Sequence, residues 1–388
     1  MSISRRTFVS GAPALLLQRP PQRTVIVMCD GFGPEYLAQS NLPTLARWRK
    51  AGLYKQVRGV MPSVTNANNA GICCGSWPAV HGITGNSYFD ERTGREEYME
   101  SPELLLAPTI FERAARHGVK SALLSSKKKT TTLLRRGAEI VLTPEAADAE
   151  WVRKLGPAPD IYSREINYWL LRAAIDILKR PAGPGCLYVH TTDYPMHTWP
   201  PEVRESKEHL TRLDALLDEA QAAAPDAAFL LTADHGLHHK SRCVDLGKAC
   251  RNRHMPLRAA ISAERDKYLQ HHRGFGGTGW VYLERPSHEE RCAAILSKLP
   301  GVETVLSRSE VARKFHLMPE RIGELVVFGD RDTVFGELNT ESEALPPAYR
   351  SHGSMYETDV PLFVHNAQGV PPADYFRQNF DLARWLYN

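Results

Sequence analysis

Side chains that could bind metal ions recur in this 388-residue chain at places where apolar, strand-like runs end. In chain order, the candidates are Asp30, Thr65, Asp193, His197, Asp234, His235 and His352. Apolar runs at residues 24–29, 186–190 and 227–232 end just before five of them. Because ligands of open α/β sheets gather at the carboxyl ends of strands, we expect these side chains to converge.

Carboxylate oxygen and imidazole nitrogen are ligands that Zn²⁺ accepts, so this set suffices for two ions. A structural alternative exists for each member, since an Asp that ends a strand is commonly only a helix cap and a single His is commonly a surface or core residue. The whole set in this order favours a metal centre with two divalent cations. Zinc is the expected metal, and other divalent ions are left open.

Residues 61–69 could supply a nucleophile next to that centre. Pro62 favours an extended approach, and Thr65 or Asn66 is a suitable N-cap for a helix that follows. A hydroxyl at a helix N-terminus faces unpaired N–H groups, which suit a phosphoryl oxygen, and a nearby metal would lower its pKa. The alternative is that Thr65 only caps the helix.

Three consecutive lysines, Lys127, Lys128 and Lys129, follow another strand-like run at residues 120–125. They should therefore lie at the same sheet edge as the metal ligands. Adjacent cations repel one another and need an anion or solvent to be stable. They would suit an anionic substrate, and the alternative is a solvated charge run.

Alternating strands and helices predict an α/β fold in which a mainly parallel sheet has helices on both faces. Helices are expected at residues 42–51, 109–117, 164–179, 202–222 and 375–387. The pattern changes after His235, with strands at residues 280–284, 302–306 and 324–328 and a helix at 287–299. We therefore predict a metal-binding core at 23–240 and 331–388, and a smaller inserted α+β cap at 241–330.

Six short motifs together resemble the alkaline phosphatase superfamily, in its phosphodiesterase-like branch. They lie at residues 29–31, 62–65, 81–83, 193–197, 234–236 and 350–361. The resemblance implies two zinc ions. One would be held by Asp193, His197 and His352, and the other by Asp30, Thr65, Asp234 and His235.

Within that branch, residues 65–69, 81–90 and 126–129 are most similar to the phosphonoacetate hydrolase family. The resemblance implies that Asn86 binds a phosphonate oxygen and that Lys127 and Lys129 engage a substrate carboxylate. It also places His271 and His272 of the cap near the active site. This chain departs from the family pattern at Lys128, where an acidic residue is usual, and at Ala67, where proline is usual.

The activity implied is zinc-dependent hydrolysis of the C–P bond of phosphonoacetate to acetate and phosphate, through a phosphothreonine at Thr65. A phosphodiesterase or nucleotide pyrophosphatase of the same superfamily is the first alternative. A non-catalytic protein that binds an anion or zinc is the second. The expected partner is a small-molecule phosphonate or phosphoester, and a homodimer is left open.

A formal charge of +4 is modest, and 43% apolar with 24% charged residues is typical of a soluble globular protein. No basic stripe with interleaved aromatic residues supports nucleic-acid binding, and no apolar run of about 18 residues predicts a membrane span. Residues 4–9 resemble a twin-arginine export signal, followed by a short apolar run at 11–17. We expect a leader at residues 1–22 and export to the periplasm; the alternative is a disordered basic leader on a cytoplasmic enzyme.

Overall fold

A seven-stranded sheet forms the larger part of the computed structural model, which describes residues 22–267 and 273–387. Strands β8, β1, β7, β5 and β6 are parallel, whereas β18 is antiparallel to both of its neighbours. The strand order is β2 (Leu53–Arg58), β18 (Asp359–His365), β8 (Ala228–Thr232), β1 (Thr24–Met28), β7 (Cys186–His190), β5 (Ser121–Ser125) and β6 (Ile140–Leu142).

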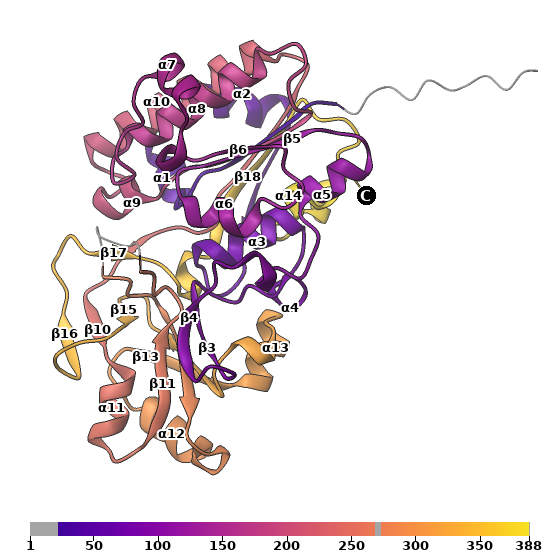
Figure 1. Cartoon of the computed structure of the whole chain (residues 1–388). Helices are drawn as coiled ribbons and strands as arrows, with labels where there is room; N and C mark the ends of the chain where they lie inside the picture. The colour runs from indigo at the N-terminus through magenta and orange to yellow at the C-terminus, as the bar shows by residue number, and fades with distance from the viewer. Residues whose placement is uncertain (1–21, 268–272, 388) are drawn as a thin grey trace, which may run out of the picture.

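Helices cover both faces of this sheet (Figure 1). One face carries α2 (Pro43–Ala51), α8 (Glu165–Leu178) and α10 (Arg204–Ala223). The other carries α3 (Thr65–Cys74), α6 (Lys128–Leu134) and α14 (Asp381–Arg384), and α5 (Ile110–Arg116) packs on β5. The α/β prediction is confirmed, and four predicted helices are found to within two residues as α2, α5, α8 and α10.

Four further helices of the larger region are short. They are α1 (Pro34–Gln39), α4 (Pro78–His81), α7 (Ala149–Leu155) and α9 (Tyr194–Thr198), with single 3₁₀ turns between elements. None of the helices in the described ranges combines the length and the apolar character needed to cross a bilayer.

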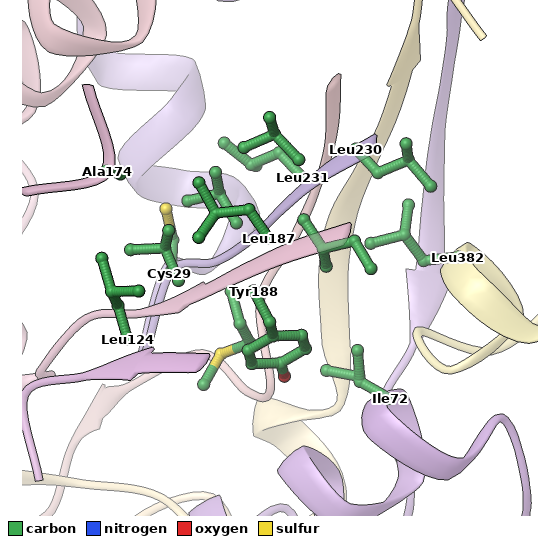
Figure 2. Close-up of a cluster of buried hydrophobic side chains, with 14 of the residues drawn as sticks. Cys29, Ile72, Leu124, Ala174, Leu187, Tyr188, Leu230, Leu231 and Leu382 are labelled. Carbon is green, nitrogen blue, oxygen red and sulfur yellow. The ribbon is translucent and has the colours of Figure 1, made fainter. Parts of the chain in front are cut away.

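The main core lies between the sheet and its two helical layers. Strands β1, β7 and β8 are buried along their whole length, as expected for parallel strands covered on both faces. Figure 2 shows Leu187 and Leu230 of these strands packed near Ile72 of α3 and Leu382 of α14. The near-continuous apolar sequence of each central strand is therefore a consequence of its position in the sheet.

A second region lies beside this core, in the lower part of Figure 1. Its antiparallel sheet has the order β11 (Leu257–Ser262), β12 (Thr278–Leu283), β14 (Leu325–Gly329) and β13 (Val302–Ser307), with helices α11 (Leu246–Asn252), α12 (Glu289–Leu296) and α13 (Arg308–Phe315). Strand β10 (Arg242–Val244) pairs with β15 (Thr333–Phe335) and β16 (Ser342–Ala344), and β3 (Ser87–Asp90) forms a hairpin with β4 (Arg95–Tyr98). We propose the elements from β10 to β16 as the inserted cap, which the pairing of β10 extends beyond residue 330. The β3–β4 hairpin comes from the segment predicted as core and contacts β11.

The predicted closing helix at residues 375–387 is wrong. The structure has a 3₁₀ turn at Ala373–Tyr375 and only the four-residue helix α14. Between them, the amide of Arg58 donates to Arg377 O and the amide of Asn379 donates to Arg58 O, at 3.1 and 2.9 Å. Pairing with the end of β2 therefore competes with helix formation in this segment.

The spacing of Cys243 and Cys250 would allow a bridge across a short loop in an oxidised protein, but the structure has no disulfide there. All seven cysteines are described, and each is free and buried. Cys250 Sγ lies 4.0 Å from Cys292 Sγ, whereas Cys243 belongs to a separate apolar cluster.

The topology explains why polar residues after different strands meet. Strands β8, β1, β7 and β5 are parallel neighbours, so the segments that follow them leave the same sheet edge. A two-stranded ribbon, β9 (His238–His239) with β17 (Arg350–Ser351), leads directly to His352.

Truncation of a central strand should test this core. Leu230 is fully buried, so Leu230→Ala should lower the free energy of unfolding by about 2–5 kcal/mol through lost burial and the cavity left behind. Leu106, which is 55% exposed, provides the matched control, and Leu106→Ala should change the free energy by less than about 0.5 kcal/mol. Urea unfolding followed by circular dichroism would measure both, and equal losses would contradict the packing described.

Candidate metal centre

Asp30, Asp234 and His235 form one group of potential metal ligands at the sheet edge, and all three are fully buried. His235 Nε2 lies 3.6 Å from Asp30 Oδ1 and 3.4 Å from Asp234 Oδ2. Thr65 Oγ1 lies 3.4 Å from the same His235 nitrogen. The four residues predicted to share one ion are therefore neighbours.

Asp193, His197 and His352 are also neighbours. Asp193 Oδ2 lies 3.0 Å from His197 Nε2 and 3.9 Å from His352 Nε2. The His352 ring stacks on that of His235, with centroids 3.6 Å apart. The two groups therefore adjoin, and all seven predicted ligands converge on one place.

Buried polar atoms at this place lack partners, which tests whether cations fit. Asp30 Oδ1 and Asp234 Oδ2 are buried and accept no hydrogen bond. Burial and the neighbouring Asp30 carboxylate raise the pKa of Asp234 well above its usual range. Unpaired buried charge is costly, and divalent cations accept these oxygen and nitrogen donors. The donor set therefore fits metal ions.

All three candidate histidines direct the same nitrogen toward the centre. The Nδ1 atoms of His197, His235 and His352 lie 2.8, 3.1 and 2.8 Å from the backbone carbonyl oxygens of Arg350, Gly236 and Ser63. Because a carbonyl oxygen only accepts, Nδ1 must carry the proton in each ring. When such a ring is neutral, Nε2 carries the lone pair, as in metal-binding histidines. Burial alone would lower the pKa of His352, but Glu264 and Asp193 raise it to about 9, so metal binding at this ring would displace a proton from Nε2.

Thr65 is the first residue of helix α3, and Val64 occupies the N-cap position, so the predicted cap at Thr65 or Asn66 is wrong. No side-chain hydrogen bond caps this helix. The Thr65 hydroxyl instead faces His235 at the candidate centre. Capping alone therefore does not account for Thr65.

Lys127 provides positive charge to the two ligand groups. Its Nζ lies 2.9 Å from Asp30 Oδ2 and 2.9 Å from Asp193 Oδ1. Burial alone would lower the pKa of Lys127, but the two carboxylates outweigh it and raise the pKa above its usual range. Lys129 forms an ion pair with Asp266, and both of these side chains are buried. Neither lysine is a solvated surface charge, whereas Lys128 is exposed.

A cavity of about 320 Å³ opens beside these lysines. Its lining includes Lys127, Lys129, Tyr162, Thr192 and Asp266. The cavity could therefore admit the part of a substrate that extends away from the metal ligands.

Asn86 lies next to the start of helix α3. Its Oδ1 accepts a hydrogen bond from the Asn66 amide at 3.1 Å, and its Nδ2 donates to Glu264 Oε2 at 3.2 Å. These two bonds fix the orientation of the side-chain amide. The Asn66 amide, which lies in the first turn of α3, is therefore already bonded to Asn86.

Sequence reasoning missed three buried residues at the centre. His190 Nε2 lies 3.2 Å from Asp30 Oδ2, and Glu264 Oε1 lies 3.3 Å from His352 Nε2, while Asp266 pairs with Lys129. His190 ends the strand-like run 186–190, so the strand-end rule could have found it. Glu264 and Asp266 follow β11 in an irregular segment that carries no such signal. His271 and His272 lie outside the described residues.

The model of the type I phosphodiesterase/nucleotide pyrophosphatase family matches residues 24–355, most of the chain. The chain belongs to this family. It is a hydrolase of the alkaline phosphatase superfamily, as the sequence motifs indicated.

Other members of this superfamily resemble the chain in structure or sequence. Phosphonoacetate hydrolase from Sinorhizobium meliloti, solved with phosphonoacetate bound, is 30% identical with a TM-score of 0.84 over 95% of both chains. Murine ectonucleotide pyrophosphatase/phosphodiesterase 5, at 16% identity, has a TM-score of 0.67 over 89% of this chain and 88% of that chain, which shows the fold alone.

A Caenorhabditis elegans ectonucleotide pyrophosphatase/phosphodiesterase is 24% identical over 93% of this chain and 40% of that protein. The chain spans less than half the length of the first curated relatives it matches.

Zinc binding should stabilise the folded protein, because cations would balance the charge of the buried carboxylates. Zinc at a free concentration about 100 times its dissociation constant should stabilise the chelator-treated protein by about 2.7 kcal/mol, because it binds the folded state. Differential scanning calorimetry would measure this as a rise in Tm. Asp234→Asn should reduce the rise, whereas the control Asp226→Asn, at an exposed turn, should keep it. An equal rise in both variants would contradict the assigned ligands.

Proposed function

We propose that this protein hydrolyses the C–P bond of phosphonoacetate, giving acetate and phosphate through a phosphothreonine at Thr65. The observation that carries this proposal is the pair of largely buried lysine side chains, Lys127 and Lys129, beside the candidate metal centre. A phosphodiester has no carboxylate that these two ammonium groups could bind. The likeness to the Sinorhizobium meliloti hydrolase supports the same substrate.

The proposed ligands of one metal are Asp193, His197 and His352. Those of the other are Asp30, Thr65, Asp234 and His235. When bound, two zinc ions would neutralise phosphonate oxygens and lower the pKa of the Thr65 hydroxyl.

Thr65 Oγ1 is the proposed nucleophile. Its proton passes to solvent, and the alkoxide attacks phosphorus, so that a P–O bond forms while the P–C bond breaks and its electron pair leaves with the acetate carbon. The carboxylate delocalises this pair as an enolate, which takes a proton from water to give acetate. A water molecule then hydrolyses the phosphothreonine, which releases phosphate and restores the hydroxyl. Asn86 Nδ2 would donate to a phosphonate oxygen.

Lys127 and Lys129 would stabilise the enolate, which carries more negative charge than the ground-state carboxylate. In the structure, Lys127 compensates Asp30 and Asp193. If these two carboxylates bind divalent cations, they no longer need the ammonium group. Lys127 would then be available to the substrate carboxylate, next to Lys129 at the cavity.

A phosphodiesterase or nucleotide pyrophosphatase activity is the second candidate. The match to the family model favours it, and it would use the same metals and Thr65. A protein that only binds zinc or an anion is less well supported, because such a protein needs no hydroxyl beside the metal ligands. For localisation, we propose export through the twin-arginine signal.

The decisive experiment compares two substrates. Purified, zinc-loaded protein should release phosphate from phosphonoacetate faster than it hydrolyses a nucleotide diester, as judged by kcat/KM. The opposite ranking would replace the proposed function with the diesterase.

Removal of the nucleophile should abolish turnover without removing the metals. We expect Thr65→Ala to lower kcat by at least about 1,000-fold, since a covalent route needs the hydroxyl. Metal content, measured by inductively coupled plasma mass spectrometry, should persist because six other ligands remain. Thr65→Ser retains a hydroxyl and should keep much more activity. If Thr65→Ala is as active as Thr65→Ser, the covalent mechanism is excluded.

Removal of either buried lysine should affect one substrate class selectively. Lys127→Met and Lys129→Met should each lower kcat/KM for phosphonoacetate by about 10- to 100-fold. This factor corresponds to the free energy lost with one hydrogen bond to a charged group. Hydrolysis of bis-p-nitrophenyl phosphate should change by less than about threefold, because it has no carboxylate. Lys128→Met, at an exposed position, is the matched control. Equal losses on both substrates would show that the lysines do not select the carboxylate.

A further inference from the structure

A buried ion pair lies beside the loop that carries His352. Lys240 Nζ and Glu357 Oε1 are 2.8 Å apart, and neither side chain is exposed. His238 Nδ1 lies 2.9 Å from the same carboxylate oxygen, and Lys240 Nζ also donates to Arg331 O at 2.8 Å. A buried ion pair is tolerated when its remaining hydrogen-bonding capacity is satisfied, as here.

The second oxygen of Glu357 holds the His352 loop. Glu357 Oε2 accepts hydrogen bonds from the amide and the hydroxyl of Ser354, at 3.0 and 2.6 Å. The main chain of Ser354 is therefore held by a carboxylate whose other oxygen is bound by Lys240 and His238. This loop also has little space, because a Cβ on Gly277 would lie 2.4 Å from Ser354 Cβ.

Ser63 joins this loop to the segment that carries Thr65. Its hydroxyl donates to Ser354 O at 2.7 Å and accepts from the Gly353 amide at 3.1 Å. Its carbonyl oxygen accepts from His352 Nδ1 at 2.8 Å. Ser63 is fully buried and lies two residues before Thr65. Three hydrogen bonds of one residue thus set the position of a candidate ligand relative to the candidate nucleophile.

We propose that Ser63 is a positioning residue of the metal centre, anchored through Ser354 by the buried pair of Lys240 and Glu357. Its carbonyl keeps the proton of His352 on Nδ1, so that Nε2 is free to bind the metal. Its hydroxyl holds the His352 loop against the Thr65 segment. This inference rests on the metal centre of the proposed function, and it does not depend on which substrate is cleaved.

Zinc affinity of the full chain tests this role without any substrate. Ser63→Ala removes both hydroxyl bonds, so zinc should bind about 10- to 100-fold more weakly in competition with a chromogenic chelator. The kcat for the better substrate should fall by a similar factor while KM changes by less than about twofold. Ser121→Ala is the matched control, since the buried Ser121 hydroxyl donates to Gly137 O at the opposite end of β5.

A second variant keeps the test informative if Ser63→Ala does not fold. Ser354→Ala leaves the Ser63 bonds in place but removes the hydroxyl bond to Glu357, and it should weaken zinc binding less than Ser63→Ala. The inference is overturned if each of these two variants that folds binds zinc as tightly as the wild-type protein does. If wild-type protein does not cleave phosphonoacetate but Ser63→Ala binds zinc more weakly, the proposed substrate fails and this inference stands.

Discussion

Buried negative charge at one sheet edge is the constraint on which the rest of the structure depends. Asp30, Asp193 and Asp234 are almost completely removed from solvent. Carboxylates in such a place need compensating charge or hydrogen bonds. Lys127 satisfies two of them in part, while Asp234 Oδ2 has no partner. The stacked rings of His235 and His352, the proton positions on the histidines and the burial of Lys127 all become understandable if cations complete this charge balance.

Much of the centre could be predicted from sequence because the pattern that identifies it lies within short stretches of the chain. Each central strand is an apolar run, and a polar residue follows where the run ends. Since parallel neighbouring strands end at one edge, Asp30, Asp193 and Asp234 had to meet there. His190 was missed although it ends such a run, because it was read as part of the strand. Glu264 and Asp266 follow a strand of the second region, and their contacts depend on how that region packs against the core.

Contacts between distant segments also explain why local sequence patterns did not predict two other features. Residues 375–387 have a helical pattern, yet residues 377–379 bond to Arg58 at the end of β2. Likewise, the spacing of Cys243 and Cys250 would allow a bridge in a short loop, but a strand and a helix place them in different clusters. In both cases a contact between distant segments overrides a local preference, and one sequence contains no signal for such contacts.

The candidate metal ligands and the residues proposed to bind the substrate have different origins in the fold. Candidate ligands come from the strand ends of the core and from the His352 loop, and any hydrolase of this superfamily could use them. Lys129 belongs to the core helix α6, but its partner Asp266 follows β11 of the second region. Glu264, which holds Asn86, comes from the same segment. Under the proposed function, substrate selection depends on the junction between the two regions. The second region also reaches the candidate metal centre there, because Glu264 Oε1 lies 3.3 Å from His352 Nε2.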